Sequence, residues 1–164
     1  MELSDFLFGG VTATPTVSTD SDLVDFLRYG VAAEPRRYLG APFEFFPEGR
    51  YTVEVADMRK GCSAGGRPYL AIETLVLESS NPKLPVGGRG QLMYMLDKDA
   101  GARAAMKVLR ELYQRTEITE QDIRFAVTEQ ASNLDSSPFA GATLSVKTKL
   151  AWGGATTSEV RVWV

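Results

Sequence analysis

The chain has 164 residues, of which 44% are hydrophobic and 24% charged, and its formal net charge is −3. This length suits one domain, or one domain with an extension, and it is enough to bury a core without disulfides. The chain contains no histidine and a single cysteine, Cys62, which excludes catalysis by imidazole, histidine zinc sites and an intrachain disulfide. No apolar run is long enough for a transmembrane helix, and residues 1–10 lack the basic start of a secretory signal. We therefore expect a cytoplasmic protein without membrane association.

Charge and composition change at residue 48. Residues 1–48 hold eight acidic and three basic side chains, a charge of −5, whereas residues 49–164 carry +2. The first segment also contains four prolines and a stretch rich in Thr, Ser and Pro. These features predict an acidic N-terminal arm over residues 1–48 that lies outside the core, and a folded domain over residues 49–164. One short helix is expected in the arm at residues 21–29, ending at Gly30.

Three strands are predicted next. Residues 50–58 alternate between apolar and polar side chains, as in a half-buried strand. Residues 68–78 are apolar on both faces, which is typical of a central strand. Residues 91–96 form a third, short strand. The glycine-rich sequence KGCSAGG at residues 60–66 and the residues 79–90 are predicted loops.

Two helices and a hairpin follow. Asp97 or Asp99 is expected to cap a helix whose apolar stripe ends at Tyr113. A second helix starts at Thr119, which forms a capping-box-like pair with Asp122, and it ends near residue 130. Residues 143–150 and 158–164 alternate as two strands, joined by a turn at residues 152–154 that contains two glycines.

This order of elements predicts an all-β barrel with a helical insert. Three strands, a pair of helices and a closing hairpin are the order of a five-stranded OB-fold, with the helices between strands three and four. In that fold the ligand surface lies on strands two and three, and the loops that join strands one to two and four to five lie at its rims.

A sequence pattern extends over the last two thirds of the chain. It comprises PEGRYTV at residues 47–53, the glycine-rich loop, YLAIE at residues 69–73, the pair of helices and FAGATLSV at residues 139–146. This pattern resembles the small phage-encoded single-stranded DNA-binding proteins that have an OB-fold. The resemblance implies sequence-independent coating of single-stranded DNA in phage DNA replication or recombination, in the cytoplasm of the bacterial host, with a replication or recombination protein as a partner. The chain departs from common single-strand binders because it lacks an acidic C-terminal tail, and the acidic arm could substitute for one.

Binding of single strands without sequence preference requires cationic groups for the phosphates and exposed rings for the bases. Basic side chains occur in the first loop and the last hairpin, and two tyrosines lie on strands two and three. The predicted nucleic-acid-binding residues are Arg59, Lys60, Arg67, Tyr69, Tyr94, Lys147, Lys149, Trp152 and Arg161. The pattern leaves open whether the tyrosines are core residues and whether the two lysines of the hairpin form a solvated face. The basic residues of the first long helix, Arg103, Lys107 and Arg110, are interpreted as helix surface.

Enzyme chemistry is not predicted. Gly61 and Gly66 have the spacing of a phosphate-binding loop, but Arg67 and Pro68 follow, and the segment joins two strands instead of opening a helix. Cys62 has no histidine to activate it as a nucleophile. We predict that the protein is not an enzyme and takes no cofactor or metal.

Two roles are considered for the arm. In a single-strand binder, the acidic arm could fold over the barrel when DNA is absent and compete with phosphates. The alternative function is a protein-interaction or virion-structural module in which the arm wraps a neighbouring copy and forms a homo-oligomer. The apolar anchors of that interface would be Phe6, Leu7, Phe8, Phe43, Phe45 and Phe46.

Overall fold

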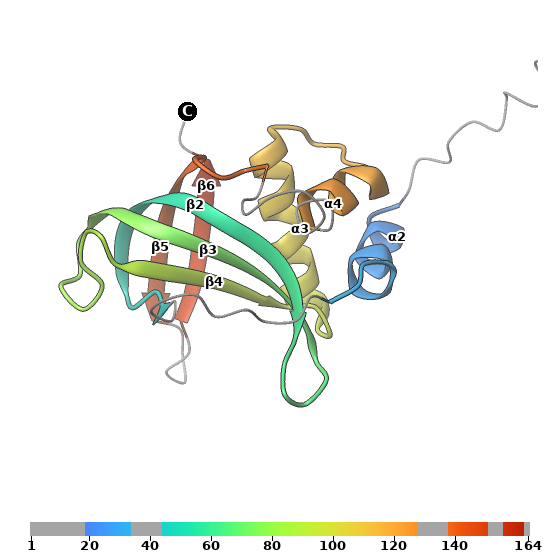
Figure 1. Ribbon diagram of the computed structural model, residues 1–164, viewed down its shortest axis with the longest axis horizontal. Helices are drawn as coiled ribbons and strands as arrows, with labels where there is room; N and C mark the ends of the chain where they lie inside the picture. The colour runs from blue at the N-terminus through green and yellow to red at the C-terminus, as the bar shows by residue number, and fades with distance from the viewer. Residues whose placement is uncertain (1–18, 34–43, 128–137, 151–155, 163–164) are drawn as a thin grey trace, which may run out of the picture.

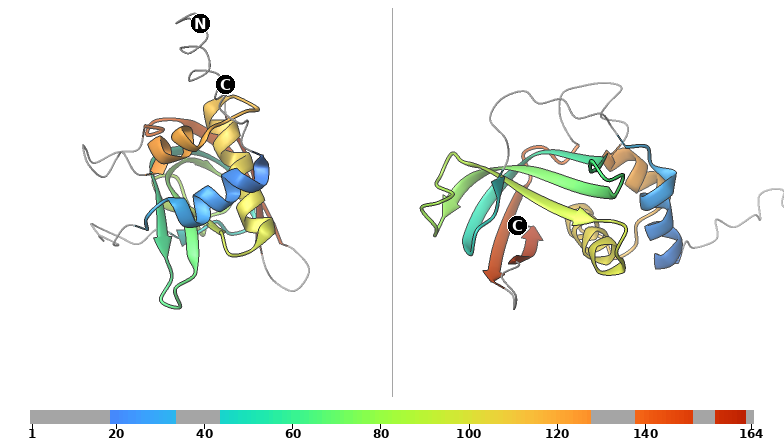
Figure 2. Two further views of the ribbon diagram at one scale, coloured as in Figure 1. Left: turned by 90° about the vertical axis from the view of Figure 1, so that its right-hand side faces the viewer. Right: turned by 90° about the horizontal axis from the view of Figure 1, so that it is seen from below.

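The computed structural model describes residues 19–33, 44–127, 138–150 and 156–162. The elements in chain order are α2 (Asp20–Asp25), the π-helical turn η1 (Phe26–Gly30), β1 (Glu44–Phe45), β2 (Gly49–Cys62), β3 (Pro68–Ser79), β4 (Arg89–Met95), α3 (Asp99–Tyr113), α4 (Glu120–Val127), β5 (Thr143–Leu150) and β6 (Thr156–Val162). The protein is mostly β, and its sheet curls into a half-barrel with the helices gathered at one end (Figure 1, Figure 2). Within the described ranges, no helix has both the length and the apolar character needed to cross a membrane.

The sheet has six strands in the order β1-β4-β3-β2-β5-β6. All neighbours are antiparallel except β1 and β4, where Glu44 lies opposite Gly90 in a parallel pair. The long strand β2 pairs with β3 along most of its length and with β5 over Gly49–Glu54. Two register shifts in β2, at residues 52/53 and 55/57, increase its twist and bend the sheet.

Helix α3 closes the open side of the half-barrel. In the part of the chain that the structure describes, no pairing joins β4 to β6, and α3 contacts both strands instead. The start of α3 lies so close to β4 that a Cβ on Gly101 would be 2.1 Å from the carbonyl oxygen of Met95. The buried residues of α3 form one stripe: Ala102, Ala105, Met106, Val108, Leu109 and Leu112. This stripe covers the inner face of the sheet.

The prediction of five strands is wrong by one strand, and the placement of the helices differs. The sixth strand, β1, comes from the segment predicted as an arm, and α2 with η1 adds a helical segment that packs on the same core. Of the described residues before position 49, four have side chains in that core: Leu23, Leu27, Val31 and Phe46. The expectation that this segment lies outside the core is therefore wrong for these residues, because the apolar face of the short helix needs cover. The division at residue 48 stays a prediction.

The predicted N-terminal caps of α4 and α3 have different outcomes. The capping box at Thr119 is confirmed, since its amide donates to Asp122 Oδ2 at 2.8 Å and its hydroxyl accepts from the Asp122 amide at 3.2 Å. The N-cap of α3 is instead Lys98, without a side-chain cap. Asp97 and Asp99 pair with Arg67 and Arg28, so the expectation that one of them caps α3 is wrong.

Candidate functional site

The predicted site residues are divided between the two faces of the sheet. Residues directly opposite each other on neighbouring strands point to the same face. Tyr94 lies opposite Leu70, a fully buried residue of the inner face. Tyr69 lies opposite Gly61 and Met95, on the outer face. The two tyrosines therefore cannot form one stacking surface on a single face of the sheet.

Tyr69 is a structural residue of the outer face. Only 3% of it is exposed, and its ring lies against Gly61, where a Cβ would be 2.5 Å from the ring. An aromatic ring over a cross-strand glycine fills the space that the missing side chain leaves. The ring is not presented to a ligand in this arrangement.

Two of the basic residues expected in the first loop lie on β2, because this strand extends to Cys62. Lys60 is 3% exposed, and its Nζ donates to the carbonyl oxygen of Arg28 at 2.5 Å and to that of Val31. Burial lowers the pKa of Lys60. The expectation of a loop lysine is therefore corrected: Lys60 holds the end of η1 against the sheet.

The other two predicted basic residues of this region, Arg59 and Arg67, have carboxylate partners. Arg59 Nη2 lies 2.5 Å from Glu73 Oε1, with 15% and 10% of the two side chains exposed. Arg67 Nε donates to Asp97 Oδ2 at 2.7 Å, which connects the β2–β3 turn to the end of β4. Neither guanidinium is thus an uncompensated positive charge.

The outer face carries further buried polar groups. Asp57, Glu73 and Gln91 form one cross-strand row, and burial is the main cause that raises the pKa of Asp57. Arg59 Nε and Gln91 Nε2 are buried, and the described residues offer neither atom a hydrogen-bond partner. This face is polar, but its charges are largely compensated within the sheet.

A groove of about 400 Å³ lies between α3 and β6, here called the α3–β6 groove. Its lining residues come from β4, α3, β5 and β6 and are Tyr94, Ala104, Lys107, Val108, Lys147, Lys149, Thr157, Ser158, Glu159 and Val160. The groove brings together three of the predicted residues, Tyr94, Lys147 and Lys149. It adds Lys107, which the sequence pattern assigns to the helix surface. The sequence around Lys107, between Ala104 and Val108, gives no sign that β6 packs beside this part of α3.

Positive charge exceeds negative charge in the α3–β6 groove. Among the residues that the structure describes, three lysines line it against one carboxylate, Glu159. That carboxylate lies opposite Lys147 in the β5–β6 pairing and also accepts from Arg161 Nη2 at 3.2 Å. Arg161 itself is outside the lining and 72% of its side chain is exposed. The groove therefore offers cationic groups whose charge is only partly compensated.

Tyr94 supplies the aromatic part of the groove. Its hydroxyl is buried and has no hydrogen-bond partner in the part of the chain that the structure describes, and burial raises its pKa. Buried polar atoms without partners are rare in folded proteins, so this hydroxyl is an unusual polar group in the wall of the groove. Trp152, the other ring predicted on this side, lies outside the described residues.

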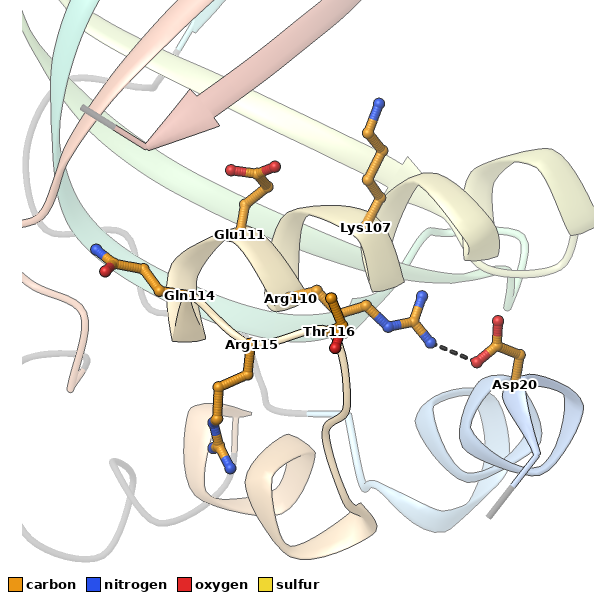
Figure 3. A pocket seen from close by; sticks show the side chains of 7 residues that line it. All are labelled: Asp20, Lys107, Arg110, Glu111, Gln114, Arg115 and Thr116. Atoms are coloured by element: carbon orange, nitrogen blue, oxygen red, sulfur yellow. Dashed lines mark hydrogen bonds and ion pairs between the residues drawn. The ribbon is translucent and has the colours of Figure 1, made fainter. Parts of the chain in front are cut away.

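A second hollow, of about 680 Å³, lies where the end of α3 meets the start of α2, here called the α2–α3 hollow (Figure 3). Its lining residues are Asp20, Lys107, Arg110, Glu111, Gln114, Arg115 and Thr116. Arg110 Nη2 lies 2.5 Å from Asp20 Oδ1, and Arg115 Nη2 lies 2.9 Å from Asp122 Oδ1. Lys107 lines both the hollow and the groove.

Comparison with known proteins gives no family assignment: no family model matches the chain, and no curated protein matches it. Among the residues that the structure describes, no group of Cys, Asp and Glu is placed to hold a metal ion, and Cys62 is an exposed free thiol.

Proposed function

We propose that the protein binds single-stranded DNA, without sequence preference, through the α3–β6 groove. The observation that carries this proposal is the convergence of Tyr94 with Lys107, Lys147 and Lys149 around a groove with one carboxylate. In this proposal the protein coats single strands during phage replication or recombination, in the cytoplasm of the bacterial host.

The two kinds of side chain have complementary tasks. Lysine ammonium groups neutralise phosphates and release counterions, which makes the affinity fall as salt rises. An aromatic ring accepts any base by stacking, which contributes about 1–3 kcal/mol per base. The overall charge of −3 is compatible with this function, since only the surface that meets the phosphates needs positive potential.

The arrangement of the long strands supports an OB-fold as the finer description. The five long strands follow the order β4-β3-β2-β5-β6, with helices between β4 and β5 and a hairpin at the end. These are the elements of a partly open five-stranded barrel, to which β1 is a short addition. The binding surface that we propose lies at the α3–β6 side and not on the outer face of β3 and β4, whose charges are compensated.

The test is fluorescence anisotropy of a labelled oligo-dT at low and moderate salt, with a duplex of equal length for comparison. We expect tighter binding to the single strand, weakening with salt. The double variant Lys147→Gln/Lys149→Gln should bind about tenfold more weakly, with a salt slope reduced by about 0.7 for each lost phosphate contact. The control is Lys83→Gln/Lys98→Gln, which removes the same charge from exposed positions that line neither hollow. Absence of oligo-dT binding at low salt would overturn the proposal.

A protein-interaction module is the second candidate, and exposed aromatic residues favour it. Tyr29, Phe45 and Phe125 are 80%, 64% and 45% exposed, and aromatic side chains are enriched at protein interfaces. Phe46, predicted as an anchor, is buried beside Tyr51 instead. Light scattering of the full chain and of Phe45→Ser would test this function: an oligomer that the substitution dissociates, in a protein without DNA affinity, would support it.

A further inference from the structure

We propose that the α2–α3 hollow is a second binding site for a backbone phosphate of the nucleic acid, and that the Asp20 carboxylate occupies this site when nucleic acid is absent. This inference rests on the proposed function, because it extends the path of the bound strand from the α3–β6 groove across α3.

The two hollows share a lining residue on α3, Lys107. Lys107 is exposed and lines both, so its ammonium group can contact a phosphate that passes from one to the other. Arg110 follows Lys107 by three residues, which places both on neighbouring positions of the helix surface. A strand that leaves the groove at Lys107 therefore meets Arg110 next.

Arg110 has an incomplete partner in Asp20. The carboxylate accepts from Nη2 at 2.5 Å, while Arg110 Nε is buried and has no hydrogen-bond partner among the described residues. Guanidinium groups pair most strongly with oxyanions that accept two parallel hydrogen bonds. A phosphate diester has two non-bridging oxygens in that arrangement, and it would satisfy Nε and Nη2 together once Asp20 has withdrawn.

Asp20 can withdraw without disturbing the fold. Its side chain is 81% exposed, and exposed ion pairs contribute little to stability. The helix that carries it is held by other contacts, namely the capping box of Thr19 and Asp22 and the buried side chains of Leu23 and Leu27. Only the carboxylate of Asp20 needs to move when a phosphate enters.

The other charges of the hollow are compatible with an anion. Figure 3 shows Lys107 and Glu111 extending to the same side of α3, whereas Arg110 points toward Asp20. Glu111 is four residues after Lys107, within reach of its ammonium group. Arg115 is paired with Asp122 on α4 and serves as a nearby positive charge rather than as a direct ligand.

The experiment measures oligo-dT affinity of four variants of the full chain by anisotropy. Asp20→Asn should bind about threefold more tightly than the unmodified chain, since the competing carboxylate is removed. Arg110→Gln should bind about tenfold more weakly, with a salt slope smaller by about 0.7. The double variant Asp20→Asn/Arg110→Gln should bind no more tightly than Arg110→Gln alone, because the guanidinium that Asp20→Asn frees is absent. Arg103→Gln is the matched control on the same helix, outside both linings.

A spectroscopic readout separates a direct contact from altered folding. The Nε–H signal of Arg110, assigned by its loss in Arg110→Gln, should shift on addition of oligo-dT at concentrations where inorganic phosphate leaves it unchanged. An equal shift with inorganic phosphate would overturn the strand path and leave a simple anion site. If oligo-dT binds but Asp20→Asn and Arg110→Gln behave like the control, this inference is wrong and the proposed function stands. If the unmodified chain does not bind oligo-dT, both fall.

Discussion

The outer face of β2, β3 and β4 and the α3–β6 groove are both lined by basic and aromatic side chains, yet they differ in how those charges are compensated. On the outer face Arg59 is paired with Glu73 at 2.5 Å, and both side chains are largely buried. In the groove three lysines share one carboxylate. The difference teaches that a residue type on a strand is a poor guide to binding until its partner is known.

Desolvation explains why the two regions have different uses. A buried charge is stable only with its partner, so Arg59 cannot turn to a phosphate without leaving Glu73 unpaired. Lysines at a hydrated groove carry no such constraint, since water solvates them until a phosphate arrives. The outer face thus contributes to stability, and the groove is available for binding.

The largest effect is expected from a substitution that displaces α3 from β4, because α3 forms one side of the α3–β6 groove. Gly101→Ala would place a Cβ 2.1 Å from the Met95 carbonyl oxygen, so α3 must shift away from β4. We expect a loss of about 3 kcal/mol or more in the free energy of unfolding, together with lost oligo-dT binding, measured by urea denaturation and anisotropy. Gly65→Ala is the matched control, because the nearest atom to its Cβ lies at 3.9 Å. Equal stability of the two variants would contradict the placement of α3.

The next effect contrasts a buried ion pair with an exposed one. Glu73→Gln leaves the Arg59 guanidinium without its partner and should lower the free energy of unfolding by about 3 kcal/mol. Glu159→Gln removes a carboxylate whose side chain is 54% exposed and should change stability by less than about 0.5 kcal/mol. Urea denaturation measures both. The second variant should also bind oligo-dT more tightly, since Glu159 is the one carboxylate among the described residues that line the groove. Similar stabilities of the two variants would remove the distinction between the regions.

The two tyrosines provide a comparison at the level of binding. Tyr94→Leu should weaken oligo-dT binding by about tenfold, in line with the loss of one stacked base. Tyr69→Leu should lower the melting temperature, because the ring over Gly61 is lost, and leave the affinity of the folded protein unchanged. Anisotropy at a temperature where both variants are folded separates the effects. An affinity loss confined to Tyr69→Leu would place the binding surface on the outer face instead.

The sequence predicted the strands and helices better than the tertiary contacts that they make. The alternation in β2 and β5, the apolar run of β3, the helical stripe of α3 and the capping box at Thr119 can all be read from the sequence, because each depends on neighbours within a few residues. The core role of Leu23 and Leu27 cannot, because an acidic, proline-rich segment gives no local sign that its one apolar stripe has a distant partner. The strand β1 has two residues, too few for a periodic pattern.

The candidate site was only partly predictable for the same reason. Residues Tyr94, Lys147 and Lys149 were named from their strands, and the structure places them at one groove. Lys60 and Arg59 have the same residue types, but their partners, the carbonyls of η1 and Glu73, are distant in sequence. Lys107 was missed because its relation to β6 depends on tertiary packing. Periodicity assigns a side chain to a face, and only the fold decides what that face meets.

The smallest effect concerns the end of α3, where Tyr113 donates its hydroxyl proton to the Asp122 carbonyl oxygen at 2.6 Å. Burial, followed by the negative charge of Asp122, raises the pKa of Tyr113 to about 12, from an ordinary value of 10. Between these values the unfolded chain loses a proton that the folded protein retains, so stability falls as pH rises through 10 toward 12. Tyr113→Phe removes the hydrogen bond, which should lower the free energy of unfolding by about 1 kcal/mol at pH 8. It also removes the titrating hydroxyl, so its stability lacks this dependence on pH.

Urea denaturation of Tyr113→Phe and of the unmodified chain between pH 8 and pH 11 measures that difference directly. Burial also raises the pKa of Tyr51 and Tyr94 and lowers that of Lys60, but these groups are common to both proteins and cancel in the comparison. The stability gap should therefore narrow as pH rises above 10. A gap that stays constant would mean that the Tyr113 hydroxyl titrates alike in the folded and unfolded chains, and that the contact between the end of α3 and α4 does not hold its proton. The groove and the α2–α3 hollow share α3 as a wall, so this contact bears on how firmly both are positioned.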